Sequence, residues 1–187
     1  MKKIMSKRTA EYWVKQLGLR PHPEGGYYRE TYRSPEIIAR AALPKRYNGR
    51  RTLATAIYFL LRADQFSAFH RLKSDEIWHF YDGHPVSIFI IGKNGRLASF
   101  KLGLDARQGE QPQVVIRAGN WFAAGLANRK SPASGGKIAN RKSYALIGCT
   151  VAPGFDFADF EIGNRKELCR QFPKHHALIN RLTADKN

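Results

Sequence analysis

The chain has 187 residues, of which 43% are hydrophobic, and this length predicts a single domain with its own core. Lys and Arg number 32 against 15 Asp and Glu, so the formal net charge is +17. Such a charge favours anionic partners, but most of the basic residues fall in segments with loop composition and form no basic amphipathic helix. We therefore interpret the charge as surface charge and do not expect nucleic-acid binding.

Cysteine usage and hydropathy bear on the cellular compartment. Cys149 and Cys169 lie in no CxxC or Cys/His spacing, which predicts reduced thiols. The longest apolar stretch, TLATAIYFLL, is half the length of a membrane span, and no apolar segment follows the basic start as it would in a signal peptide. The sequence thus predicts a cytoplasmic protein without a membrane segment.

The first predicted element is a helix over about 9–18, where Thr9 can cap the first turn and Gly18 can end the last. The run YYRETYRS then alternates like a strand, and the basic, proline-punctuated segment 35–50 is predicted to be a surface excursion. Before the strand, His22 lies between two prolines, and we interpret it as part of a rigid turn rather than as a catalytic residue.

From residue 51 onwards short β-prone runs recur, separated by turn signals such as Lys93-Asn94-Gly95. Many short, closely spaced strands predict an all-β sandwich or barrel, here over about 24–163. The Gly/Ser/Lys-rich stretch 127–142 is predicted to be a mobile loop. Helical patterning returns over about 164–183, with a break at Pro173. The whole chain, 1–187, therefore reads as one all-β domain with short flanking helices.

The stretch 69–83, FHRLKSDEIWHFYDG, is the strongest candidate for a functional site. It places His70, Asp75, Glu76 and His79 among aromatic side chains. Burying a charge without a partner costs several kcal/mol or shifts a pKa, so an ordinary core would not hold these carboxylates. The cluster is expected either to bind a ligand or to pair internally.

Strand alternation sorts the side chains of this stretch by face. If Glu76 points inward, Trp78 and Phe80 do so too, and His79 points to the other face unless a bulge intervenes. In the strand YYRETYRS, Tyr28 and Glu30 share one face, and we expect Glu30 to approach the site. A histidine beside a carboxylate suits general acid–base chemistry, because the carboxylate orients the ring and holds its pKa near neutrality.

The same stretch matches part of a known metal-binding pattern. The first cupin motif has a His-x-His pair, then a Glu and a Gly, and supplies three ligands to a metal in the barrel. Here His70, Glu76 and Gly83 occupy the first His, the Glu and the final Gly, whereas Leu72 replaces the second His. In the second motif Phe122 replaces the ligand His. Two of four metal ligands are missing, so we predict no cofactor and a metal-free barrel.

Four blocks together resemble the cupin-5 family, also called DUF985: HPEGGYYRETYRS, FHRLKSDEIWHFYDG, GNWFAA and CTVAPGFDFADFEI. The resemblance extends from about Leu17 to Gly163. It implies a double-stranded β-helix, or jelly-roll cupin barrel, that forms homodimers and holds a pocket inside the barrel. It implies no particular reaction, because one fold supports many functions.

We expect the barrel to bind a small polar or anionic metabolite, with a sugar or sugar nucleotide as a candidate, and to act as an epimerase or isomerase. The predicted catalytic residues are His70, as the base, and Glu76. The predicted ligand-binding residues are Tyr28, Glu30, Trp78, His79 and Phe80. Two alternatives stay open: a cupin that binds a small molecule without catalysis, and a metal-dependent dioxygenase or isomerase that uses His70, Glu76 and His79.

Overall fold

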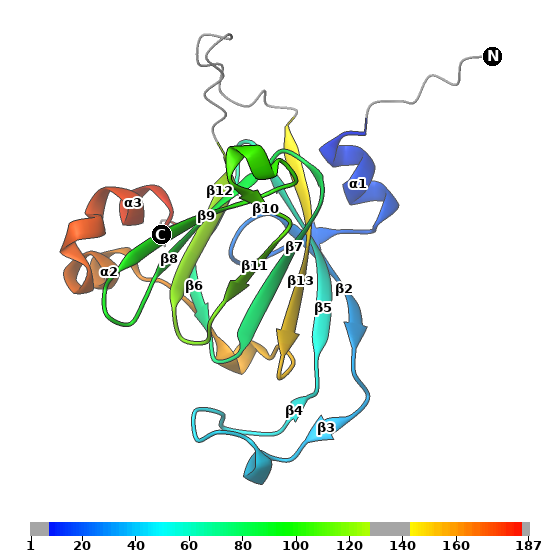
Figure 1. The fold of residues 1–187 in the computed structure, drawn as a ribbon. Coiled ribbons are helices and arrows are strands. Elements are labelled where there is room, and N and C mark those ends of the chain that lie inside the picture. The colour runs from blue at the N-terminus through cyan, green and yellow to red at the C-terminus, as the bar shows by residue number, and fades with distance from the viewer. Residues whose placement is uncertain (1–7, 128–142, 185–187) are drawn as a thin grey trace, which may run out of the picture.

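The computed structural model describes residues 8–127 and 143–184 and is built from two six-stranded sheets (Figure 1). In spatial order, the first sheet contains β1 (Arg20–Pro21), β2 (Tyr27–Arg33), β5 (Thr55–Arg62), β13 (Tyr144–Ala152), β7 (Asp75–Gly83) and β11 (Gln113–Ile116). The second contains β10 (Glu110–Gln111), β9 (Leu97–Leu102), β8 (Val86–Ile91), β12 (Trp121–Leu126), β6 (Phe66–Leu72) and β14 (Phe160–Ile162). The predicted jelly-roll fold is confirmed.

The core lies between the sheets, where the alternate side chains of facing strands meet. Its largest members are Trp78 and Phe59 of the first sheet and Phe122 of the second, all at most 1% exposed. Strand β13 is central in its sheet, which explains why nearly every residue of YALIGCTVA is buried.

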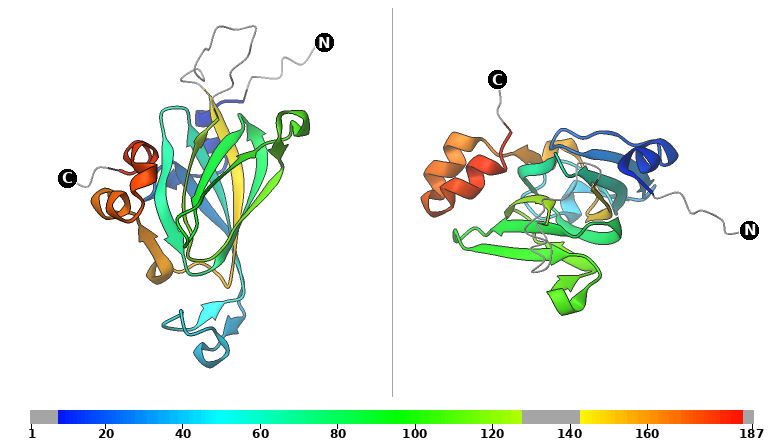
Figure 2. Two further views of the ribbon diagram at one scale, coloured as in Figure 1. Left: turned by 60° about the vertical axis from the view of Figure 1, so that its left-hand side comes forward. Right: turned by 90° about the horizontal axis from the view of Figure 1, so that it is seen from above.

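Helices cover the outer faces of the sheets (Figure 2). Thr9 caps α1 (Ala10–Gln16) by accepting a hydrogen bond from the Tyr12 amide, and this helix packs against the first sheet. Helices α2 (Arg165–Gln171) and α3 (His176–Arg181), with the 3-10 turn η4 (Pro173–His175) between them, cover the second sheet. None of the helices in the described ranges is long and apolar enough to cross a membrane.

The predicted surface excursion projects from one end of the barrel (Figure 1). It contains β3 (Ile37–Ile38) and the 3-10 turn η1 (Arg40–Ala42) and returns through β4 (Arg51–Thr52). A fully buried tyrosine anchors it, because the Tyr47 hydroxyl lies 3.0 Å from the Lys73 carbonyl oxygen. Two further 3-10 turns, η2 (Ala106–Gln108) and η3 (Phe157–Asp159), lie in connections. Apart from Ala127, the stretch predicted to be a mobile loop lies outside the described residues.

Candidate functional site

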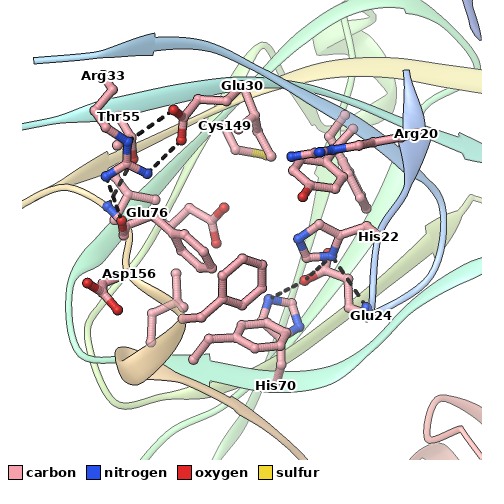
Figure 3. A pocket seen from close by; sticks show the side chains of 18 residues that line it. Arg20, His22, Glu24, Glu30, Arg33, Thr55, His70, Glu76, Cys149 and Asp156 are labelled. Atoms are coloured by element: carbon pink, nitrogen blue, oxygen red, sulfur yellow. Dashed lines mark hydrogen bonds and ion pairs between the residues drawn. The ribbon is translucent and has the colours of Figure 1, made fainter. Parts of the chain in front are cut away.

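A cavity of about 370 Å³ opens between the two sheets, with polar side chains among its apolar walls (Figure 3). Its walls come mainly from β2, β5, β13 and β7 of the first sheet and from β6 of the second, and residues of the segment 155–160 line one side. The titratable groups that line it include His22, Glu24, Glu30, His70, Glu76 and Cys149. A concave, mostly apolar site with a few converging polar groups is typical of small-molecule binding.

Glu24 reaches the cavity from the loop before β2 because two glycines let that loop run against β6. Gly25 has φ +107°, and a Cβ built on it would lie 2.1 Å from the Phe66 carbonyl oxygen. The Glu24 carbonyl accepts a hydrogen bond from the Ala68 amide at 2.8 Å. The Glu24 side chain accepts another from the Ser67 hydroxyl, which lies 2.8 Å from Oε1. The loop therefore fixes a carboxyl group inside the barrel.

His70 and Glu24 form a buried pair in which the position of the hydrogen atoms follows from the contacts. The Nδ1 of His70 lies 2.7 Å from the Ala68 carbonyl oxygen, which can only accept, so Nδ1 carries the hydrogen. Burial lowers the pKa of His70 to about 3, so the ring is neutral at pH 7 and its Nε2 is an acceptor. Nε2 lies 3.1 Å from Oε2 of Glu24.

Glu24 is the donor in that contact. Burial raises the pKa of its carboxyl group well above the ordinary value, and the neighbouring Glu76 adds to the rise. Because Nε2 of the neutral ring can only accept, the contact is a hydrogen bond in which the carboxyl group keeps its proton and donates to Nε2 of His70. Both ring nitrogens of His70 thus have partners, and the predicted role of His70 as the base does not suit this arrangement.

Glu76 is buried, lines the cavity from β7, and its carboxyl group points into the open space (Figure 3). Its Oε2 atom has no hydrogen-bond partner among the described residues. Burial raises the pKa of Glu76 from 4.5 to about 7, and the nearby Trp78 indole and Cys149 thiol offset only part of the rise. The group is therefore half ionised near neutral pH and can accept a proton from a ligand.

His22, interpreted from the sequence as part of a rigid turn, lines the same cavity. The Glu24 amide lies 3.3 Å from its Nδ1 and can only donate, so Nδ1 accepts. Burial lowers the pKa of His22 to about 4, which leaves a neutral ring with its hydrogen on Nε2. The ring packs edge-on against Tyr28, with centroids 4.6 Å apart.

Two arginines lie at the cavity wall and differ in their pairing. The Arg33 guanidinium donates to both carboxylate oxygens of Glu30, at 2.6 and 3.0 Å, and to the Phe155 carbonyl. The Arg20 guanidinium lies over the ring of Tyr28, 5.0 Å from its centroid, and forms no ion pair within the described residues. Each nitrogen of the Arg33 guanidinium therefore has a protein partner, whereas Arg20 keeps its donors for solvent or a ligand.

The structure brings together four of the seven predicted site residues: Tyr28, Glu30, His70 and Glu76 all line the cavity. Trp78 lies deeper, in the core beside Phe59 and Phe122, and does not line it.

The other two predicted residues lie away from the cavity. His79 projects from the other face of β7, where its ring contacts Gln113 at 3.3 Å. Phe80 packs against the core near the far end of β7 and borders a separate depression beside Asp82. Neither side chain is placed to touch a ligand in the cavity.

The proposed metal ligands do not converge. In the part of the chain that the structure describes, no three His, Cys, Asp or Glu side chains are arranged to hold a metal ion. Where the cupin pattern has ligand histidines, the ring of Phe122 packs at a tilt against His70, with centroids 3.9 Å apart, and Leu72 contributes an apolar wall. The donor set of His70, Glu76 and His79 does not fit a metal, because His79 lies on the opposite face of its strand.

The comparisons with known proteins agree with the fold. Residues 11–163 match the sequence model of a protein family, Cupin_5, which is described as cupin superfamily (DUF985). The chain belongs to the cupin-5 (DUF985) family. An uncharacterized protein of Saccharomyces cerevisiae, YML079W, is 32% identical over 147 residues, which cover 74% of this chain and 67% of the yeast protein.

Two solved structures of similar sequence share the whole fold. Protein SO0799 from Shewanella oneidensis is 36% identical, with a TM-score of 0.79 over 96% of this chain and all of that one. A hypothetical protein from Leishmania major is 34% identical, with a TM-score of 0.83 over 95% of this chain and all of that one. None of these names states an activity, so the function of this cupin-5 protein has to be argued from its cavity.

Proposed function

We propose that the barrel cavity binds a small polar metabolite and catalyses proton transfer on it, as an epimerase or isomerase does. The observation that carries the proposal is Glu76, a buried carboxyl group with a pKa of about 7 and an oxygen that has no partner among the described residues. Enzymes raise the pKa of catalytic carboxyl groups to such values because a base works best near the operating pH.

A second proton-transfer group supports the proposal. The protonated Glu24 and the neutral His70 share one hydrogen over 3.1 Å, and both line the cavity. In Figure 3 they lie across the open space from Glu76. A base on one side of a bound molecule and an acid on the other can remove a proton from one face of a carbon and return one to the opposite face. Glu76 is the base in this scheme, and the Glu24–His70 pair is the acid.

The proposal is tested without knowing the product, by incubating the protein in D2O with ketoses, aldoses, sugar acids and sugar nucleotides. Proton NMR then shows which C–H signals disappear. We expect exchange at a carbon of at least one compound, and we expect Glu76→Gln to slow it about 100-fold or more, the contribution of a positioned general base. Glu161→Gln, a carboxyl-to-amide change on the exposed edge strand β14, is the matched control.

A further measurement distinguishes the proposed proton transfer from the alternative, in which the cupin binds its ligand without catalysis. Saturation-transfer NMR on the same mixtures detects binding independently of exchange. Binding with no exchange at any carbon would contradict the proton-transfer function and favour the non-catalytic alternative.

A further inference from the structure

His22 offers the cavity a hydrogen-bond donor, whereas Glu76 offers it an acceptor. Because the Glu24 amide donates to Nδ1 of His22, the hydrogen of the neutral ring is on Nε2. No acceptor contacts Nε2 within the described residues, although only 7% of the His22 side chain is exposed. Figure 3 shows this edge of the ring directed toward the open space. The cavity therefore presents one buried acceptor, on Glu76, and one buried donor, on His22, that the protein itself leaves unpaired.

This acceptor and this donor fit a ligand that has a C–H bond on the carbon next to a carbonyl group. When a base removes that hydrogen, the electron pair of the C–H bond forms the enolate, and the negative charge moves to the carbonyl oxygen. A donor fixed at that oxygen stabilises the charge as it develops. A neutral imidazole serves this purpose in enzymes that abstract such protons, because its N–H is held in place and the site stays dry.

The rim of the cavity adds a positive group. Arg20 extends from β1 over the ring of Tyr28, the same ring against which His22 packs. The other rim arginine, Arg33, is neutralised by Glu30, so Arg20 is the guanidinium whose donors remain free for a ligand among the described residues of the cavity wall. Guanidinium groups bind carboxylate and phosphate oxygens in two parallel hydrogen bonds.

We infer that the ligand is a small anionic carbonyl compound, whose carbonyl oxygen accepts from Nε2 of His22 and whose carboxylate or phosphate group binds Arg20. The inference rests on the proposed proton transfer and names its substrate class. Glu76 takes the proton from the carbon next to the carbonyl, the enolate oxygen is held by His22, and the Glu24–His70 pair returns a proton to the carbon. Water then restores the proton of Glu24 and removes that of Glu76.

Four probes separate the parts of the inference. Dihydroxyacetone has the carbonyl without the charge, dihydroxyacetone phosphate adds a phosphate, hydroxypyruvate adds a carboxylate, and inorganic phosphate lacks the carbonyl. Affinity is measured by ligand-observed NMR and deuterium incorporation by proton NMR. We expect at least one of the two anionic carbonyl probes to bind about tenfold or more tightly than dihydroxyacetone, and the preferred one identifies the anionic group.

Two variants test the two contacts. Arg20→Gln, at an exposed side chain, should abolish the preference for the charged probe and leave dihydroxyacetone binding unchanged. His22→Phe keeps a ring against Tyr28 but removes the donor, and should slow deuterium incorporation about 100-fold, as loss of one oxyanion donor does. His22→Gln retains an N–H and should restore part of that rate, which a purely structural role of His22 would not explain.

The outcomes distinguish this inference from the proposed function. If the Arg20-dependent preference appears without deuterium incorporation into any probe, the ligand class stands and the proton transfer fails. If charged and uncharged probes bind alike in wild type and Arg20→Gln, or if His22→Phe exchanges as fast as wild type, the ligand class is wrong even where exchange itself occurs.

Discussion

Nε2 of His70 lies 3.1 Å from Oε2 of Glu24, although one residue comes from β6 and the other from the loop before β2. With Nδ1 of His70 bound to the Ala68 carbonyl, this contact joins a neutral ring to a neutral acid. The arrangement satisfies both groups without burying a charge, which in this site would lack a counter-ion.

The neutral state of this pair can be tested by substitution. Glu24→Gln preserves a neutral donor to His70, so we expect a loss of unfolding free energy of about 1 kcal/mol or less at pH 7. Glu24→Ala leaves Nε2 of His70 without a partner and should cost about 2–3 kcal/mol. Urea denaturation measures both. A buried ion pair would behave differently, since Glu24→Gln would then cost about 3–5 kcal/mol.

The raised pKa of Glu76 predicts a pH dependence of stability. Between 4.5, its ordinary pKa, and about 7, its pKa in the folded state, the folded protein binds more protons at this group than the unfolded chain does. Its contribution to stability therefore falls as pH rises through this window, by on the order of 3 kcal/mol in total. Relative to wild type, Glu76→Gln should gain stability by about that amount from pH 4 to pH 8.

The measurement is the difference in unfolding free energy between wild type and Glu76→Gln at several pH values. Taking the difference matters because other buried groups titrate in the same range, including His22 and His70, whose pKa values are lowered. A difference that stays constant from pH 4 to pH 8 would show that the carboxyl group of Glu76 is not perturbed.

The fold was predictable because its signals are local. Alternating strands and turn signals such as Lys93-Asn94-Gly95 occur within a few residues of each other, and a barrel follows from their spacing. His70 and Glu76 were found for the same reason, as two polar residues inside one short aromatic stretch. Alternation also indicates which face a side chain occupies, and it placed His79 away from Glu76.

The rest of the site depends on information that local patterns lack. Alternation does not say how far along the barrel a residue lies: Phe80 is four residues from Glu76, or about 13 Å along an extended strand, beyond the cavity. Glu24 enters the site through contacts with β6, and His22 through packing against Phe59 and Phe160, all of them distant in sequence. The available signal was an acidic residue between a proline and two glycines, because adjacent glycines mark a backbone path that other residues cannot follow.

The buried ion pair of Arg51 and Asp159 links the excursion to the cavity wall. Arg51 donates to both carboxylate oxygens at 2.6 Å, and both side chains are about 5% exposed. Asp159 ends the turn η3, which begins at Phe157 in the wall of the cavity. We expect Asp159→Asn to cost about 3–5 kcal/mol, because it leaves the Arg51 charge buried and uncompensated.

The double variant Arg51→Met, Asp159→Leu is the control for that prediction. It removes both charges and should recover most of the stability that Asp159→Asn loses. Thermal or urea denaturation measures the three proteins. Equal losses in the single and the double variant would show that packing, rather than the uncompensated charge, determines the cost.

The edge of the first sheet bears on the expected homodimer. Strand β1 pairs only with Tyr27 and Tyr28, so the rest of β2 forms an outer edge in the part of the chain described, where Tyr32 is 52% exposed. Open edges pair readily with a second chain. We expect light scattering to show a dimer at micromolar concentration and Tyr32→Glu to shift it toward monomer. A monomeric wild type would contradict the prediction.

Gly25 sets the path of the loop that carries Glu24. A side chain at position 25 should therefore disrupt both the loop and the position of Glu24. An alanine there would adopt φ +107° and place its Cβ 2.1 Å from the Phe66 carbonyl oxygen, so the backbone has to move. We expect Gly25→Ala to lower the free energy of unfolding by on the order of 3–4 kcal/mol and to weaken ligand binding, because Glu24 shifts with the loop.

Gly109→Ala is the matched control. The φ of Gly109 is +73° and no atom lies within 4 Å of the added Cβ, so this change should cost only about 1–2 kcal/mol. Urea denaturation gives both costs, and equal values would show that close contact with β6 does not constrain the loop.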